Sequence, residues 1–193
     1  MNMSQLIDAM HNCEQAPGIS IMQHGIMVHN AYNKIINGLE SGIFPEKWRI
    51  PEWTHILLPY LMNEDIIKKY HIFHDCGKPY CISFDENGRK HFSNHANVSA
   101  NIAKDMKELS CAENLIRMDM DIHLLKSDGV EEFATRQEWA TLIITGIAEV
   151  HANAEMFGGL DSDSFKIKIK HIVKRGKNIL NFLNLNTIQH FRI

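Results

Sequence analysis

The sequence predicts an all-α protein built as one helical bundle, with at most one small β-hairpin near residues 81–92. Three observations carry this prediction. Apolar residues recur mostly at the three- and four-residue spacing of helices. The 193 residues suit one compact domain, and no repeat, linker or composition shift divides them. The strongest short-range hairpin signal is Asn87-Gly88, which lies between short extended flanks.

The first predicted helix runs from about Ile19 to Ile36, after a break at Ala16-Pro17-Gly18. Its apolar stripe includes His24, so this imidazole is expected to point inward. Further helices are predicted where the helical spacing resumes: about Thr54 to Met62, Asp65 to His74, from Asn94, about Ala112 to Leu125, after Gly129, and Ser164 to Leu185.

Several of these helices place an ionisable group on an otherwise apolar face. His95, Asp119 and Glu149 each lie on the apolar stripe of a different helix, and the helix from Asp65 ends in His74-Asp75. A hydrogen-bonded core residue is the simpler interpretation of any single one. Buried carboxylates are costly unless they are paired or bind a metal, and helical bundles build metal sites from converging imidazoles and carboxylates. The set as a whole therefore favours a metal site.

The composition argues against several other classes of protein. The net charge of -3 and the pI near 6.4 do not suit a general electrostatic nucleic-acid binder. No apolar run approaches the roughly 20 residues of a membrane helix, and Met1 to Met10 do not resemble a signal peptide. The four cysteines form no Cys-x-x-Cys pair, as expected of free thiols in a reducing cytoplasm. We therefore expect a cytoplasmic protein without a membrane partner.

One stretch carries a specific motif: His74-Asp-Cys-Gly-Lys-Pro79, then Asp85-Glu-Asn-Gly-Arg-Lys-His-Phe-Ser-Asn-His95 and Val98-Ser-Ala100. It resembles the HD-domain metal-dependent phosphohydrolases, and within them the HD domain of bacterial CCA-adding tRNA nucleotidyltransferases. The resemblance covers about 21–159 and implies a single HD-type phosphohydrolase domain over 1–193. A basic helix over 164–185 follows the matching part.

The resemblance implies a set of metal ligands. His24, His74 and Asp75 match the core ligands of the family, and His95 matches an extra histidine of its dinuclear members. Asp75 is then the best bridging ligand between two ions.

Two further ligand positions depart from the family pattern. Asp119 stands where the family usually has His, with His123 as an alternative ligand, and Glu149 stands where the family has Asp. A degenerate site is one interpretation of these changes. A retuned site is the other, because both replacements are still metal-ligating side chains.

Other residues are candidates for contact with the substrate. Lys78 follows the motif and is predicted to stabilise charge on a phosphate, although a cation at a helix C-terminus is the alternative. Arg117 is a candidate phosphate ligand or an exposed helix arginine, and His123 is a candidate second contact.

The implied function is a metal-dependent phosphodiesterase or phosphatase that acts on a small nucleotide or an RNA end, with 2′,3′-cyclic or 2′-phosphates as the first substrates to test. One or two divalent ions are implied. They would turn bound water into a hydroxide nucleophile, with Mn²⁺ or Mg²⁺ favoured and Co, Ni, Fe or Zn also acceptable. The alternative is a non-catalytic nucleotide- or protein-binding module that keeps a structural metal.

The C-terminal predicted helix is rich in lysine and arginine and has no acidic residue from Ser164 onward. A solvated helix face is the simpler interpretation. Attraction of a polyanion is the functional one, without base stacking because no aromatic residues alternate with the basic ones. The basic residues are Lys166, Lys168, Lys170, Lys174, Arg175 and Lys177.

Overall fold

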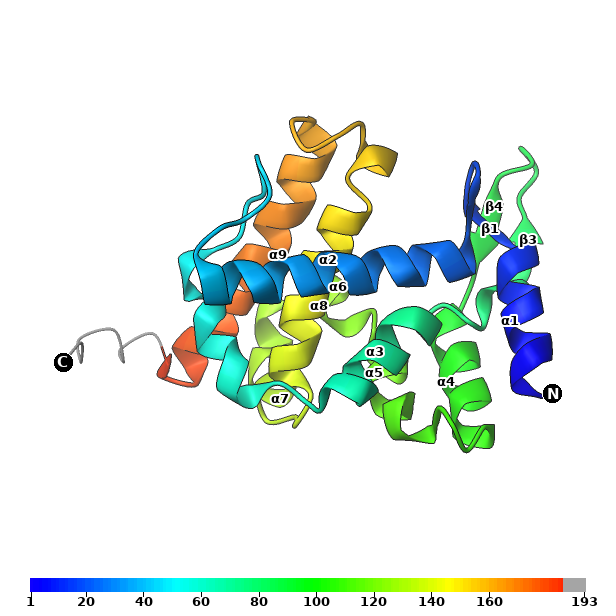
Figure 1. Cartoon of the computed structure of the whole chain (residues 1–193), viewed down its shortest axis with the longest axis horizontal. Helices are drawn as coiled ribbons and strands as arrows, with labels where there is room; N and C mark the ends of the chain where they lie inside the picture. Colours follow the sequence, from blue (N-terminus) through cyan, green and yellow to red (C-terminus); the bar gives the residue numbers. More distant parts are fainter. Residues whose placement is uncertain (186–193) are drawn as a thin grey trace. The chain divides into compact units, whose positions relative to one another are not determined.

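The structure is a computed structural model that describes residues 1–185 (Figure 1). This part of the chain contains nine α-helices, several short 3-10 helices and two small two-stranded sheets, so the prediction of a mainly helical protein is confirmed. Close contacts group the described residues into two compact units, 1–30 with 63–120 and 31–62 with 121–185. The HD-type domain over 1–193 stays a prediction, and its residues 186–193 lie outside the described residues.

The first unit holds the first half of α2 and four further helices. Helix α1 begins with a capping box, in which Asn2 accepts a hydrogen bond from the Gln5 amide and the Gln5 side chain accepts one from the Asn2 amide. In α3 the Asn63 side chain accepts from the Asp65 amide. The helices of this unit are α1 (Met3–Asn12), α2 (Ile21–Ser41, as far as Asn30), α3 (Glu64–Phe73), α4 (His95–Asp105) and α5 (Glu113–Arg117), with 3-10 turns at Lys78–Tyr80 and Ser110–Ala112.

Two antiparallel hairpins also belong to the first unit. Strand β3 (Ile82–Phe84) pairs with β4 (Lys90–Phe92), as the Asn-Gly signal predicts. Strand β1 (Glu14–Ala16) pairs with β2 (Ile19–Ser20) in a second hairpin. The expectation of at most one hairpin was therefore wrong, because Pro17-Gly18 forms a hairpin turn, with Gly18 at a φ of +74°, rather than a plain helix stop.

Glycines allow close backbone contacts in this unit. A Cβ on Gly25 of α2 would lie 2.4 Å from the Ile72 carbonyl oxygen of α3. A Cβ on Gly77 would lie 2.4 Å from the Ser99 amide nitrogen of α4, and the Gly77 amide donates to the Ser99 hydroxyl over 2.8 Å. Side chains on α2, α4 and the loop after α3 are thereby brought within a few ångströms of one another.

The second unit is built on α8, a helix that is buried almost all round, as its apolar composition requires. Helix α9 is amphipathic and buries Phe165, Ile169, Ile172 and Ile179 on one face. The elements of this unit are the remainder of α2, a 3-10 helix (Glu52–Tyr60), α6 (Asp121–Leu124), a 3-10 turn (Ser127–Gly129), α7 (Val130–Ala134), α8 (Trp139–Ala152), a 3-10 turn (Glu155–Phe157) and α9 (Asp163–Phe182).

Several helix boundaries differ from those predicted. Helix α2 begins at Ile21 and continues to Ser41, and the segment predicted as a helix near 54–62 is a 3-10 helix. The predicted helix over 112–125 is broken after Arg117, so Asp119 and His123 do not share a helix face. After this break, the Asp119 carboxylate lies against the Tyr70 hydroxyl. The two residues are far apart in the sequence, so the local spacing of apolar residues does not predict their contact.

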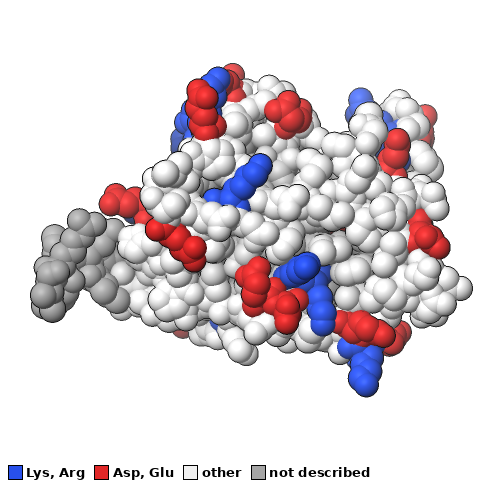
Figure 2. Space-filling view, viewed as in Figure 1, with Lys and Arg blue, Asp and Glu red and all other residues white. Residues whose placement is uncertain are grey.

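Within residues 1–185, no helix is both long enough and apolar enough to cross a membrane. On the face of the molecule in Figure 2, Lys and Arg side chains lie among Asp and Glu side chains. This mixture agrees with the nearly balanced charge of the sequence.

Candidate metal centre

The end of α3 supplies the first two residues of the site. His74 caps this helix and Asp75 follows it, and both side chains are buried. The Nδ1 of His74 lies 2.9 Å from the His71 carbonyl oxygen. Because a carbonyl oxygen only accepts, the proton sits on Nδ1, and in a neutral ring the lone pair sits on Nε2. That Nε2 lies 3.3 Å from Asp75 Oδ2.

Helix α2 adds His24, whose side chain is fully buried. Its Nε2 lies 3.7 Å from Asp75 Oδ2, and its ring meets the His74 ring edge-on at 5.2 Å between centroids. The approach depends on Gly25, which lets α2 contact the backbone of α3. His24, His74 and Asp75 each offer a ligand atom, and these atoms all lie within 4.8 Å of one another.

His95, the first residue of α4, reaches the other oxygen of Asp75. Its Nε2 lies 3.4 Å from Asp75 Oδ1, and its Nδ1 lies 2.9 Å from the Phe92 carbonyl oxygen. Because the Phe92 carbonyl oxygen only accepts, the proton of a neutral His95 ring sits on Nδ1, and the lone pair of Nε2 faces Asp75. Two histidines thus face one carboxylate oxygen, and a third faces the other.

Lys78 is the cation nearest to this carboxylate. Its side chain is buried, and Nζ donates to Asp75 Oδ2 over 2.6 Å and to Gln15 Oε1 over 2.9 Å. The ammonium also lies 5.3 Å from the centre of the Phe92 ring. Burial by itself raises the pKa of Asp75, but the positive charge of Lys78 is the largest opposing effect, and this pKa is held well below its ordinary value. Asp75 is therefore a carboxylate at neutral pH.

These residues fit a divalent metal ion. Asp75 Oδ1 is buried and accepts no hydrogen bond from the described residues, and it faces the Nε2 of His95. Two lone pairs facing each other repel, whereas a cation between them is attracted to both. Imidazole nitrogens with a carboxylate oxygen are ordinary ligands of divalent transition metals. His24, His74, Asp75 and His95 would hold such an ion.

Asp119 lies in the turn after α5 and is buried. Its Oδ1 accepts a hydrogen bond from the Tyr70 hydroxyl over 2.7 Å, and the Tyr70 ring meets the His74 ring edge-on at 6.3 Å. Asp119 is thus connected to His74 through Tyr70 and is not part of the compact ligand group. Its role as a metal ligand stays a prediction.

His123 and Glu149 lie in the second unit, where they pair with each other. His123 Nε2 is 2.8 Å from Glu149 Oε2, and both side chains are half-buried. Their predicted roles, as ligand or substrate contact for His123 and as closing ligand for Glu149, stay predictions.

Arg117 is held by neighbours on its own helix, α5, and on the preceding helix, α4. Its guanidinium donates to Glu113 over 2.8 Å and to Asn101 over 3.2 Å. The arrangement is that of a helix ion pair at four-residue spacing. Binding of a phosphate by Arg117 stays a prediction.

Two residues that support the site were not predicted from the sequence. His71 is fully buried and supplies the carbonyl that orients His74, and its Nδ1 lies 3.4 Å from that of His29. His71 lies three residues before His74 in the sequence, and this helical spacing could have indicated that it supports the His74 ring. Gln15 reaches Lys78 from the unpredicted hairpin, and no local pattern indicates this long-range contact.

Comparisons with family models, with curated proteins and with solved structures found no match for this chain.

Proposed function

We propose that this protein is a metal-dependent phosphohydrolase that acts on the phosphoester of a nucleotide or an RNA end. The observation that carries the proposal is the convergence of three imidazoles on the two oxygens of Asp75. The HD-type motif around His74-Asp75 supports the same chemistry.

The proposed ligands are His24, His74, Asp75 and His95. A divalent ion bound there supplies positive charge that polarises a phosphoryl oxygen and lowers the pKa of water. The chain itself fixes the ligands beforehand, because the carbonyl oxygens of His71 and Phe92 orient two of the rings.

Lys78 is proposed to contact the phosphate. Its ammonium lies beside Asp75 Oδ2 and is held by Gln15, so it is a fixed positive charge at the edge of the ligand group. A fixed cation stabilises negative charge that develops on phosphoryl oxygens, without reorganisation during the reaction.

A non-catalytic module with a structural metal is the second candidate. The specific observation in its favour is that Glu149, which the sequence predicts as the closing ligand, is engaged with His123. A module of this kind binds the metal without turning over a phosphoester.

Turnover separates the two candidates. The purified chain with added Mn²⁺ is screened against bis-p-nitrophenyl phosphate, p-nitrophenyl phosphate and a panel of 2′,3′-cyclic, 2′-, 3′- and 5′-nucleotides. We expect chelator-sensitive turnover that His95→Ala reduces and that His11→Ala, at an exposed position of α1, leaves unchanged. Metal binding without turnover of any substrate favours the structural module instead.

A further inference from the structure

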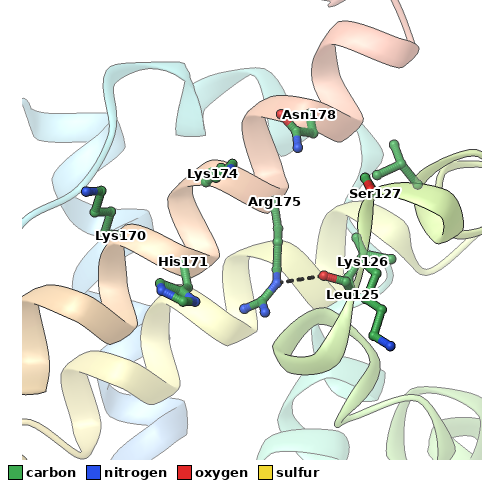
Figure 3. A pocket seen from close by; sticks show the side chains of 9 residues that line it. Leu125, Lys126, Ser127, Lys170, His171, Lys174, Arg175 and Asn178 are labelled. Atoms are coloured by element: carbon green, nitrogen blue, oxygen red, sulfur yellow. Dashed lines mark hydrogen bonds between the residues drawn. The ribbon is translucent and has the colours of Figure 1, made fainter.

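A separate pocket lies in the second unit, between α9 and the segment that precedes α7. Its volume is about 630 Å³. Figure 3 shows α9 residues along one side and Leu125, Lys126 and Ser127 on the other. The residues that line it are Leu125, Lys126, Ser127, Val130, Lys170, His171, Lys174, Arg175 and Asn178.

The helical repeat explains why basic residues gather there. Lys170, Lys174 and Asn178 follow one another at four-residue intervals along α9, and His171 and Arg175 form the adjacent row. The opposite face of α9 is buried in the core of the unit, so this face is turned toward the pocket.

The charged residues that line the pocket are all basic. Lys126, Lys170, Lys174 and Arg175 are cationic, and no acidic residue is among the lining residues. Within residues 1–185, none of these four forms an ion pair with a carboxylate. Clustered cations without counter-charges repel one another, and an anion between them relieves that repulsion.

Arg175 is held in place at the centre of this cluster. Its Nε donates to the Leu125 carbonyl oxygen over 3.0 Å, a contact drawn in Figure 3, and its side chain is half-buried. Burial lowers the pKa of the guanidinium from its ordinary value because no carboxylate compensates the charge. Since Nε is engaged, the two terminal nitrogens are the donors left for a ligand, and guanidinium pairs of this kind bind phosphate oxygens.

We propose that this pocket binds a small molecule that carries a chain of phosphate groups, such as an oligophosphate or the phosphates of a nucleoside triphosphate. The site does not depend on the proposed metal chemistry, since its residues are distinct from the metal ligands.

Two observations favour a small ligand over a nucleic-acid strand. The volume matches that of small-molecule pockets, and no Phe, Tyr or Trp is among the lining residues to offer a broad stacking surface for bases. An adjoining cavity, which shares Ser127 and Asn178, is lined by the carboxylates Asp128 and Glu131. These carboxylates would repel a phosphate backbone that continued in that direction.

Titration calorimetry of the whole chain with inorganic tripolyphosphate tests the site. EDTA is present throughout, so that a metal at the ligand group cannot carry the binding. The charge-neutralising double variant Lys170→Gln/Lys174→Gln is compared with Lys166→Gln/Lys177→Gln, which removes the same charge from residues of α9 that do not line the pocket.

We expect wild-type protein to bind one equivalent of tripolyphosphate, and ATP comparably. The pocket variant should weaken binding by at least about tenfold, and the control variant by no more than about twofold. Arg175→Lys, which keeps the charge but loses the planar fork, should also weaken binding while circular dichroism stays unchanged.

Three results would overturn the proposal. The first is no binding of tripolyphosphate by the wild type. The second is an equal loss in the two double variants, which would indicate a diffuse charge effect. The third is binding of a single-stranded RNA oligomer that is much tighter than the binding of tripolyphosphate, which would assign the basic face to a nucleic acid.

Discussion

Asp75 has more cationic and ligating groups around it than one negative charge needs. Lys78 alone, at 2.6 Å from Oδ2, supplies a counter-charge, and three imidazole nitrogens lie within 3.7 Å of the two oxygens. A buried ion pair gains little from additional neutral rings whose lone pairs face the carboxylate. The cation that we propose for this site would account for both the number and the orientation of these groups.

Replacing Lys78 by methionine tests whether a metal ion can take the place of the Lys78 charge beside Asp75. Without metal, Lys78→Met leaves the buried Asp75 carboxylate without its ammonium counter-charge, and we expect the free energy of unfolding to fall by roughly 3–5 kcal/mol. Mn²⁺ should restore more stability to this variant than to the wild type, because the ion replaces the missing charge.

Urea unfolding in EDTA and in Mn²⁺ measures both effects. The control is Lys104→Met at an exposed position of α4, which should lose little stability and respond to Mn²⁺ as the wild type does. Equal responses of the two variants to Mn²⁺ would contradict the proposed arrangement.

His151 in the second unit should make stability depend on pH. Its Nδ1 donates to the Ile147 carbonyl oxygen and its Nε2 accepts from the Arg49 amide, so both nitrogens are satisfied in the neutral ring. Burial lowers the pKa of this imidazole from 6.5, although the carbonyl contact opposes the shift. Between the lowered pKa and 6.5 the unfolded chain therefore binds a proton that the folded chain does not.

The sign of the effect follows from this difference. The contribution of His151 to stability is complete above about pH 6.5 and is lost as the pH falls toward the lowered pKa. Urea unfolding in EDTA should show a steeper loss between pH 6.5 and 5 for the wild type than for His151→Gln. The exposed-site variant His55→Gln should keep the wild-type slope, and a wild-type slope in His151→Gln would refute the assignment.

The residues of the candidate site and its surroundings were predictable to different degrees. His24, His74, Asp75 and His95 carry a motif and an apolar-face pattern that the sequence displays directly. The hydrogen bond of Asp119 to Tyr70 was not predictable, because it joins residues that lie 49 positions apart. Local periodicity shows which face of a helix a residue occupies, but it does not show which distant side chain meets it.

At the scale of elements, the contact of α2 with α3 positions His24. A Cβ at Gly25 would lie 2.4 Å from the Ile72 carbonyl oxygen and 2.9 Å from that of His71, and backbone atoms cannot move aside as side chains do. The close approach of these helices is therefore a condition for His24 to reach Asp75.

Gly25→Ala should separate the two helices. We expect a loss of at least about 1–3 kcal/mol in the free energy of unfolding, as for other overpacked interiors, together with weaker Mn²⁺ binding. Asn30→Ala, at an exposed position of the same helix, is the matched control and should change neither. A Gly25→Ala protein that binds Mn²⁺ as the wild type does would show that this contact does not position the ligands.

Most helices were predictable from spacing, but their interruptions were not. Helices α3, α4, α8 and α9 carry long apolar stripes, and their existence follows from that pattern. Helix α1 was overlooked although its Asn2 and Gln5 form a capping box. The break between α5 and α6 depends on tertiary contacts, which override local helix propensity.

At the scale of the molecule, the division into two units has no signal in the composition. One boundary between them, at residues 30 and 31, falls inside the continuous helix α2. A helix contains no Pro- or Gly-rich linker, so a search for linkers does not detect such a boundary. The mainly helical class, by contrast, depends on the spacing along the whole chain and was predictable.

Metal binding should stabilise the whole folded chain by mass action. At a Mn²⁺ concentration about 100 times the dissociation constant, the free energy of unfolding should rise by about 2.7 kcal/mol. Thermal unfolding with and without Mn²⁺ measures the rise. His95→Ala should reduce it, whereas an identical rise in that variant would exclude His95 from the site.

The proposed function depends most on the binding of a divalent ion by residues of α2, the end of α3 and α4. Electron paramagnetic resonance of Mn²⁺ titrated into the chelator-stripped protein measures free and bound ion directly, without a substrate. The account predicts one or two tightly bound ions per chain in the wild type and in His11→Ala, and none in His74→Ala with its helical circular dichroism retained. Absence of tight binding in the wild type, or wild-type binding in His74→Ala, would contradict it.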